Sequence, residues 1–149
     1  MIISIIVPTS GRSVLLHGSL VSLVAQAFPA DQFEILVIEN GTRDGSESIV
    51  TEIAQSNPEH SIRYTYEPIP GLLSGRHRGA AEAKSELLVF VDDDIEADPN
   101  WLAAIVNGFR NHPEISLLGG KSLPKFVSPV PPFIEEIFRR NDDCLNCGE

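Results

Sequence analysis

Short apolar runs alternate with helix-forming stretches along this chain, and that alternation restricts the possible folds more than any other feature. The runs predict strands at residues 2–7, 33–38, 62–66, 87–91 and 115–118. The stretches between them predict helices at residues 13–27, 44–57, 74–84 and 99–112. Strands separated by helices of this length form right-handed crossovers. We therefore predict an α/β fold, a Rossmann-like three-layer sandwich with a mostly parallel central sheet and helices on both faces.

The runs differ in how buried their strands should be. Residues 2–7 are almost continuously apolar, which is typical of a strand that is covered on both faces. Residues 87–91 form the most hydrophobic run, which we expect to be the innermost strand of the sheet. The run at 62–66 alternates apolar and polar residues, which predicts a half-exposed strand near an edge of the sheet. Ser10 or Ser13 is expected to cap the first helix.

The size and charge of the chain exclude several classes of protein. Its 149 residues suffice for one domain with a single core. It has 21 acidic and 11 basic side chains, a formal net charge of −10, which argues against binding to the phosphate backbone of nucleic acids. Any bound phosphate should therefore be held locally, through a cation. No apolar run approaches the roughly 20 residues that span a bilayer, so we expect a cytoplasmic location, including the inner face of the membrane.

The run at 87–91 leads directly into three acidic residues, Asp92, Asp93 and Asp94. Ligands of parallel sheets bind beyond the carboxyl ends of the strands, so these carboxylates should face such a crevice. Three adjacent carboxylates repel one another, and a divalent cation would supply the missing counter-charge. On an extended backbone Asp92 and Asp94 point one way and Asp93 the other. The alternative is a solvated loop in which Asp98 caps the next helix.

Four stretches resemble family-2 glycosyltransferases in their order and spacing, over roughly residues 2–125. They are SIIVPTSGR at 4–12, FEILVIENGTRDGS at 33–46, GLLSGRHRGAAEAKSELLVFVDDD at 71–94 and DPNWL at 98–102. The resemblance is to the N-terminal, nucleotide-sugar-binding half of these enzymes, and it implies the GT-A fold. It further implies inverting transfer of a sugar from a nucleotide-diphosphate donor to a saccharide, lipid or protein acceptor, with Mn²⁺ or Mg²⁺ as cofactor.

The same resemblance implies which residues bind the donor. It places donor-binding residues at Pro8, Thr9, Glu39, Arg76, Asp92 and Asp93, and a metal ligand at Asp94. In the family, the position of Glu39 contacts the base and that of Arg76 assists nucleotide binding. The sequence departs from the family pattern at Ser10-Gly11, at Glu39-Asn40 and at His77. A residue longer than Asp at position 39 could shift the base contact or select another nucleotide.

The family's general base lies in a C-terminal half that the resemblance does not reach. We expect that carboxylate outside this chain and nominate no base among the acids beyond Glu114. Two interpretations stay open: a piece of a longer enzyme, or a module that binds the donor without turnover.

The last part of the chain differs in composition from the rest. We place the donor-binding domain at residues 1–122 and a Pro-rich linker and tail at 123–149. Apolar residues in the tail could be exposed and favour self-association: Ile134, Ile137 and Phe138. Cys144 and Cys147 are expected to be inert thiols, with metal or disulfide pairing between copies as the alternative.

Overall fold

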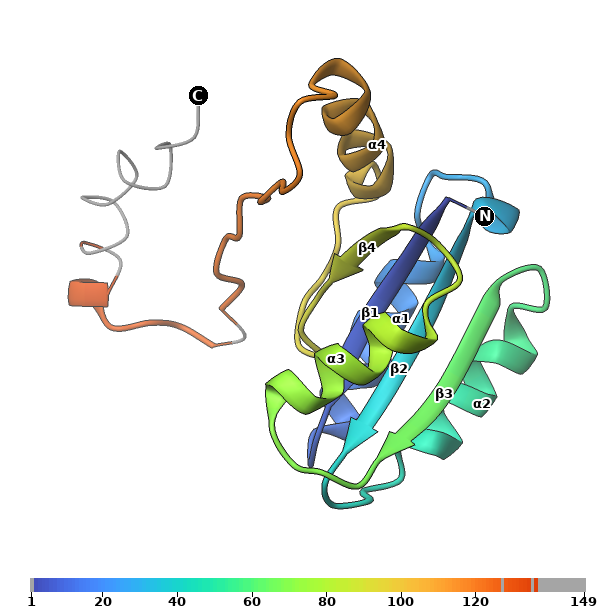
Figure 1. Ribbon diagram of the computed structural model, residues 1–149. Helices are drawn as coiled ribbons and strands as arrows, with labels where there is room; N and C mark the ends of the chain where they lie inside the picture. Colours follow the sequence, from blue (N-terminus) through green and yellow to red (C-terminus); the bar gives the residue numbers. More distant parts are fainter. Residues whose placement is uncertain (1, 127, 135, 137–149) are drawn as a thin grey trace. The chain divides into compact units, whose positions relative to one another are not determined.

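Four parallel strands form one sheet in the computed structural model, which describes residues 2–126, 128–134 and 136 (Figure 1). In chain order they are β1 (Ile3–Thr9), β2 (Phe33–Asn40), β3 (Ser61–Glu67) and β4 (Leu87–Phe90). Within the described residues their order in the sheet is β3-β2-β1-β4, and each neighbouring pair is parallel. The carboxyl ends of all four strands therefore lie at one end of the sheet, as the α/β prediction requires.

Burial follows the sequence pattern for three strands and departs from it for the fourth. Every residue of β1 and β2 is buried, and β3 is half-buried at one edge, as its alternation predicts. β4 is the other edge strand, because it pairs with β1 alone within the described chain, and Phe90 is 42% exposed. The prediction that 87–91 is the innermost strand is therefore wrong, because β1 and β2 are the inner strands of the described sheet. The hydrophobicity of a strand reflects how far its two faces are buried. It does not indicate which other strands pair with it.

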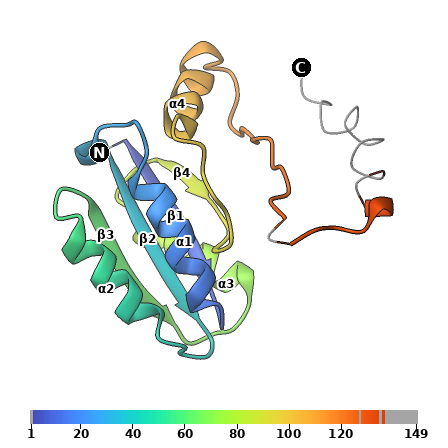
Figure 2. The same cartoon turned by 180° about the vertical axis from the view of Figure 1, so that it is seen from behind.

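Helices cover both faces of the sheet. They are α1 (Ser13–Val24), α2 (Ser46–Ser56), α3 (Leu72–Glu82) and α4 (Trp101–Asn111), with a short 3₁₀ helix, η1 (Ala30–Gln32), before β2. α3 lies on one face, and α1 and α2 lie on the other, which faces the viewer in Figure 2. Leu20 of α1, Val50 of α2 and Leu102 of α4 share one core cluster with Ile5 and Ile35 of the sheet. This arrangement confirms the three-layer sandwich.

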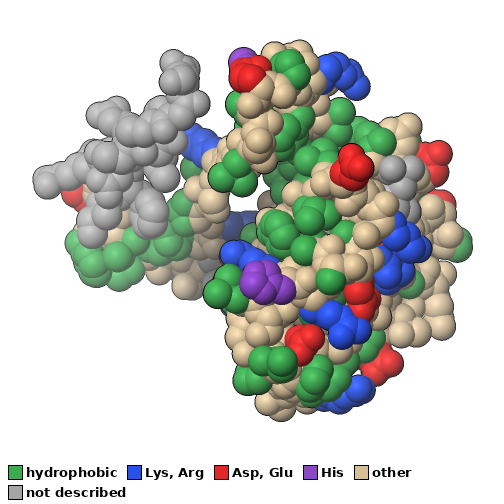
Figure 3. Space-filling model, in the orientation of Figure 1, with side chains coloured by type: hydrophobic (Ala, Val, Ile, Leu, Met, Phe, Trp, Pro, Cys, Tyr) green, Lys and Arg blue, Asp and Glu red, His purple; other side chains and the backbone are tan. Residues whose placement is uncertain are grey.

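α3 packs on the sheet through glycine. A Cβ at Gly79 would lie 2.3 Å from Cγ2 of Ile6, and one at Gly75 would lie 3.1 Å from Cβ of Pro8. A side chain at Gly79 would clash with Ile6, and one at Gly75 would be tightly packed, so the helix backbone approaches β1 closely. On the outer surface of this side, Leu73 and Phe90 are exposed, and Figure 3 shows hydrophobic side chains among the charged ones there.

A buried carboxylate connects the amino-terminal halves of three strands. Glu34 of β2, which is fully buried, accepts hydrogen bonds from Ser4 Oγ (2.6 Å), the Lys84 amide (2.8 Å) and Arg63 Nε (2.9 Å). Burial alone would raise the pKa of Glu34, but these hydrogen bonds and the Arg63 charge hold it below its usual value. The carboxylate therefore stays ionised inside the protein.

The first helix begins differently from the prediction. Neither Ser10 nor Ser13 caps α1 with its side chain, and Arg12 occupies the N-cap position without a capping hydrogen bond. Instead, Asp44 Oδ2 accepts a hydrogen bond from the Ser13 amide at 3.1 Å. The cap thus comes from the loop after β2, because the ends of β1 and β2 lie side by side.

Residues 112–149 form a second unit, and the first ends at Asn111. The strand predicted at 115–118 is wrong: no strand is present among the described residues of this unit, and Leu117 is 88% exposed. A strand forms only where its backbone groups have a partner, and an apolar run of four residues does not supply one. Ile137, Phe138 and both cysteines lie outside the described residues, and the boundary at residue 122 stays a prediction. None of the described helices is both long and apolar enough to cross a bilayer.

Candidate functional site

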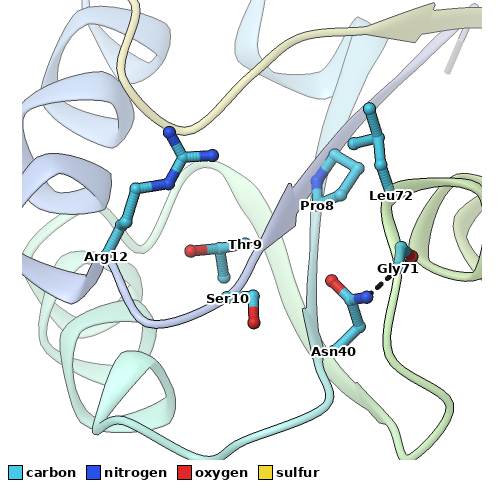
Figure 4. A pocket seen from close by; sticks show the side chains of 7 residues that line it. All are labelled: Pro8, Thr9, Ser10, Arg12, Asn40, Gly71 and Leu72. Atoms are coloured by element: carbon cyan, nitrogen blue, oxygen red, sulfur yellow. Dashed lines mark hydrogen bonds between the residues drawn. The ribbon is translucent and has the colours of Figure 1, made fainter.

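A pocket of about 210 Å³ opens at the carboxyl ends of β1 and β2 (Figure 4). Its lining comes from the end of β1, the loop that follows it, the end of β2 and the start of α3: Pro8, Thr9, Ser10, Arg12, Asn40, Gly71 and Leu72. This is where the topology of a parallel sheet predicts a ligand. Pro8 and Thr9 were predicted site residues, and the structure places both in the wall.

A hydrogen bond and a glycine fix the wall of the pocket at the start of α3. The Asn40 side chain donates from Nδ2 to the Gly71 carbonyl at 2.7 Å, as Figure 4 shows. Gly71 has a φ of +118°, a conformation that disfavours every residue with a Cβ, and the chain turns there into α3. Asn40 is almost fully buried, so it belongs to the frame of the pocket as well as to its surface.

The three aspartates after β4 do not alternate as predicted. The strand ends at Phe90 and the chain turns at residues 93–94, so the two-residue period of an extended backbone no longer applies. Asp93 and Asp94 both contact Arg12, through Oδ1 to Nη2 at 3.2 Å and Oδ2 to Nη1 at 3.1 Å. Asp92 contacts a different cation, Arg76, at 3.4 Å.

Asp93 and Asp94 differ sharply in exposure. Asp93 is fully buried, and its Oδ2 accepts a hydrogen bond from Thr9 Oγ1 at 2.6 Å. Its Oδ1 accepts no well-aligned hydrogen bond within the described chain, so the contact with Arg12 is one of charge alone. The Asp94 side chain is 44% exposed. Asp93 therefore anchors the turn to β1, while Asp94 remains available to solvent.

Arg76 extends from α3 toward the same loop. Besides its contact with Asp92, its guanidinium carbon lies 6.0 Å from the centre of the Phe90 ring. Its Nε is buried without a hydrogen-bond partner in the described part of the protein. The structure thus brings Arg76 and Asp92 together, as two of the predicted donor-binding residues, beside the end of β4.

Glu39 does not line the pocket. It is almost fully buried, and its two carboxylate oxygens accept hydrogen bonds from the Tyr64 hydroxyl and from the Asp44 amide (2.7 Å). Burial and the Glu39 carboxylate raise the pKa of Tyr64. Burial alone would raise the pKa of Asp44, but hydrogen bonds from Ser46 and other neighbours hold it below its usual value. Glu39 thus supports the loop after β2, and its contact with a base stays a prediction.

The acidic turn offers few ligands to a metal ion. Within the described residues, no group of three or more His, Cys, Asp or Glu side chains is arranged to hold one. Mg²⁺ and Mn²⁺ often use only one or two protein carboxylates and complete their shell with water and substrate phosphates. The half-exposed Asp94, next to a buried Asp93 oxygen without a hydrogen bond, fits this second kind of site.

Comparison with known proteins decides the family. The family model for glycosyl transferase family 2 matches residues 4–122. The chain belongs to this family. The match confirms the resemblance seen in the four sequence stretches, and it covers the pocket, the three aspartates and all four strands except Ile3.

Relatives and solved structures agree with this assignment. A glucosyl-dolichyl phosphate glucuronosyltransferase of Haloferax volcanii is 22% identical over 78% of this chain and 36% of its own length. The mannosyltransferase PcManGT from Pyrobaculum calidifontis, solved with GDP-Man and Mn²⁺, has a TM-score of 0.67 and 25% identity over 72% of this chain and 32% of its own. S. aureus TarS with UDP-GlcNAc shares the fold, with a TM-score of 0.66 and 23% identity over 84% of this chain and 37% of its own. The chain spans less than two fifths of each.

Sequence reasoning missed several residues that line the pocket. They are Ser10, Arg12, Asn40, Gly71 and Leu72. A signal existed for three of them, since Ser10 and Arg12 follow Thr9 directly and Asn40 follows Glu39. Gly71 and Leu72 open the third stretch that resembles the family, but the packing of α3 that brings them to the pocket joins segments far apart in sequence.

Proposed function

We propose that this chain is the donor-binding part of a glycosyltransferase that takes its sugar from a nucleoside-diphosphate donor and needs Mn²⁺ or Mg²⁺. We further propose that transfer inverts the anomeric centre. The acceptor hydroxyl belongs to a saccharide, a lipid or a protein. Two of the similar structures contain GDP-Man with Mn²⁺ and UDP-GlcNAc, which supports a nucleoside-diphosphate sugar as the donor class.

One observation carries the proposal. The turn with Asp93 and Asp94 is joined to the pocket wall, because Thr9 and Arg12 both line the pocket and both contact that turn. A diphosphate lying over the end of β1 would therefore meet the half-exposed Asp94. A carboxylate and a phosphate attract only through a cation between them, which is why the metal belongs to the proposal.

The residues of the chain divide the work of binding. Pro8, Thr9 and Asn40 line the pocket, and Arg76 of α3, which is paired with Asp92, would assist nucleotide binding. Asp94 would hold the divalent ion, and that ion when bound neutralises the charge that develops on the departing diphosphate. None of the pocket-lining side chains is a carboxylate, so the lining itself supplies no general base for the acceptor hydroxyl, and we expect that base to lie outside this chain.

The family favours an enzyme over a module that only binds. The curated relatives and the PcManGT structure are named as transferases, and the family match covers residues 4–122 of this chain. Transfer to an acceptor separates the two interpretations, because both include donor binding.

Calorimetry with GDP and UDP tests the proposal. We expect at least one of them to bind more tightly with Mn²⁺ than with a chelator, and Asp94→Asn to remove most of that gain. Asp31→Asn is the matched control: it is the same change on an exposed residue of η1, before β2 begins, and should leave the gain intact. Equal affinity with metal and with chelator for both nucleotides would refute the proposed site.

A further inference from the structure

Arg12 stands apart among the residues of the pocket. It is the one charged side chain in the lining, and its guanidinium contacts the two carboxylates of the turn after β4. Its side chain is 50% exposed. Figure 4 shows it extending from the loop after β1 alongside Thr9, toward the loop that follows β4. The positive charge of Arg12 therefore lies beside Asp94, where the proposed function places the metal ion.

The two contacts of Arg12 are unequal. Asp93 is fully buried, and a buried carboxylate without a counter-charge is costly, so its contact with the guanidinium is needed for the fold. Asp94 is 44% exposed, and water can replace Arg12 there at little cost. Arg12 can therefore release Asp94 while it keeps Asp93.

We propose that Arg12 is a positioning residue that competes with the divalent ion for Asp94. This inference rests on the proposed function, which places the ion at Asp94. With the guanidinium in contact, the charges of Arg12, Asp93 and Asp94 sum to −1, and without it to −2. A metal ion alone then binds weakly, while a metal that arrives with a diphosphate gains further ligands and displaces the guanidinium from Asp94.

The displaced guanidinium remains useful. Arg has five N–H donors in a rigid fork, so a group held by Asp93 on one side can donate to a phosphate oxygen on the other. The pocket thereby loads the ion and the diphosphate together. Arg12 thereby favours binding of a metal–diphosphate complex over binding of the free ion.

The test measures Mn²⁺ binding to the folded chain without nucleotide, by the electron paramagnetic resonance signal of free Mn²⁺. Arg12→Gln should bind Mn²⁺ about fivefold more tightly than the wild type, since a half-exposed charge contact is worth about 1 kcal/mol, which is that ratio. Arg110→Gln removes one positive charge from an exposed site in the last turn of α4 and should match the wild type. Arg12→Lys, which keeps the charge but loses the fork, should fall between the two and serves if Arg12→Gln does not fold.

The outcomes separate this inference from the proposed function. Mn²⁺ binding in the folded Arg12 variants that is no tighter than in the wild type overturns the competition, whatever Asp94→Asn does to nucleotide binding. If the Arg12 variants bind Mn²⁺ more tightly and Asp94→Asn abolishes this gain, the inference is supported. If the gain survives Asp94→Asn, the ion sits elsewhere and the inference fails. Loss of the metal effect on GDP and UDP binding in the wild type would instead refute the proposed function.

Discussion

The contact between α3 and the sheet makes a strong prediction about two glycines that both lie inside helices. Gly79 of α3 faces Ile6, and a Cβ there would lie 2.3 Å from Cγ2 and 3.2 Å from Cγ1. Gly18 of α1 is exposed, and a Cβ there would meet nothing within 4 Å. The same substitution, Gly→Ala, should therefore change stability in opposite directions at the two positions.

The magnitudes follow from two terms. In a helix, Ala is more favourable than Gly by about 0.8–1.0 kcal/mol, and Gly18→Ala should gain roughly that much in the free energy of unfolding. At Gly79 the same gain is opposed by overpacking, which costs about 1–3 kcal/mol, and a contact of 2.3 Å against a fully buried, β-branched Ile6 places the cost at the upper end. Gly79→Ala should therefore lose about 2 kcal/mol overall.

Urea unfolding followed by circular dichroism measures both effects. With a slope of roughly 1–3 kcal/mol per M, the midpoints of the two variants should differ by about 1 M or more, with the wild type between them. Ile6→Ala removes both γ-carbons that the new Cβ would strike. In that background, Gly79→Ala should no longer destabilise the protein.

Two results would refute the reasoning. The first is a Gly79→Ala variant that is stabilised as much as Gly18→Ala, which would mean that the helix does not approach β1 closely. The second is a Gly79→Ala cost that is the same with Ile6 and with Ala at position 6, which would assign the loss to something other than this contact.

Two further predictions concern buried carboxylates. Thr9→Val removes the hydroxyl that donates to buried Asp93 and should lower the free energy of unfolding by about 1–3 kcal/mol, whereas Thr9→Ser should retain most of it; equal urea midpoints for Thr9→Val and Thr9→Ser would contradict this. The pKa of Glu34 is lowered in the folded state, so its ionised form contributes stability above the ordinary pKa of Glu, and that contribution is lost as the pH falls through the depressed native pKa. Unfolding free energies measured from about pH 6 to pH 3 should fall less steeply for Glu34→Gln than for the wild type, and parallel curves would show that Glu34 does not carry this dependence.

The spacing of apolar residues along the chain predicted most of the helices and strands. The continuous apolar runs of β1 and β2, the alternation of β3 and the stripes of the four helices all appear in the structure near their expected bounds. The failures are of another kind. The run at 115–118 is apolar enough for a strand but has no partner in the described chain, and β4 is apolar but lies at an edge. Pairing joins segments far apart in sequence, so one segment's composition does not report it.

The site shows the same limit at the scale of single residues. Sequence reasoning located the strand end at residues 39–40 and took Glu39 as the ligand-facing residue, following the family. In the structure Asn40 lies in the pocket wall. Both carboxylate oxygens of Glu39 accept hydrogen bonds, one from the Tyr64 hydroxyl and one from the Asp44 amide. Neighbouring residues of a strand point to opposite faces, so Asn40 lines the pocket while Glu39 does not, and the contact of Glu39 with a base stays a prediction.

The net charge of −10 opposes the binding of an anion to this pocket. The guanidinium of Arg12 contacts both the buried Asp93 and the exposed Asp94, and that of Arg76 contacts Asp92. Each arginine near the pocket thus has a carboxylate beside it, so neither offers a free positive charge to a diphosphate. A ligand that brings its own divalent cation reverses this balance, because the carboxylates that repel a bare diphosphate then attract the complex. On the proposed function, the aspartates after β4 and the arginines beside them therefore act together, and removing an arginine should strengthen binding of the ion while it weakens the hold on the phosphate.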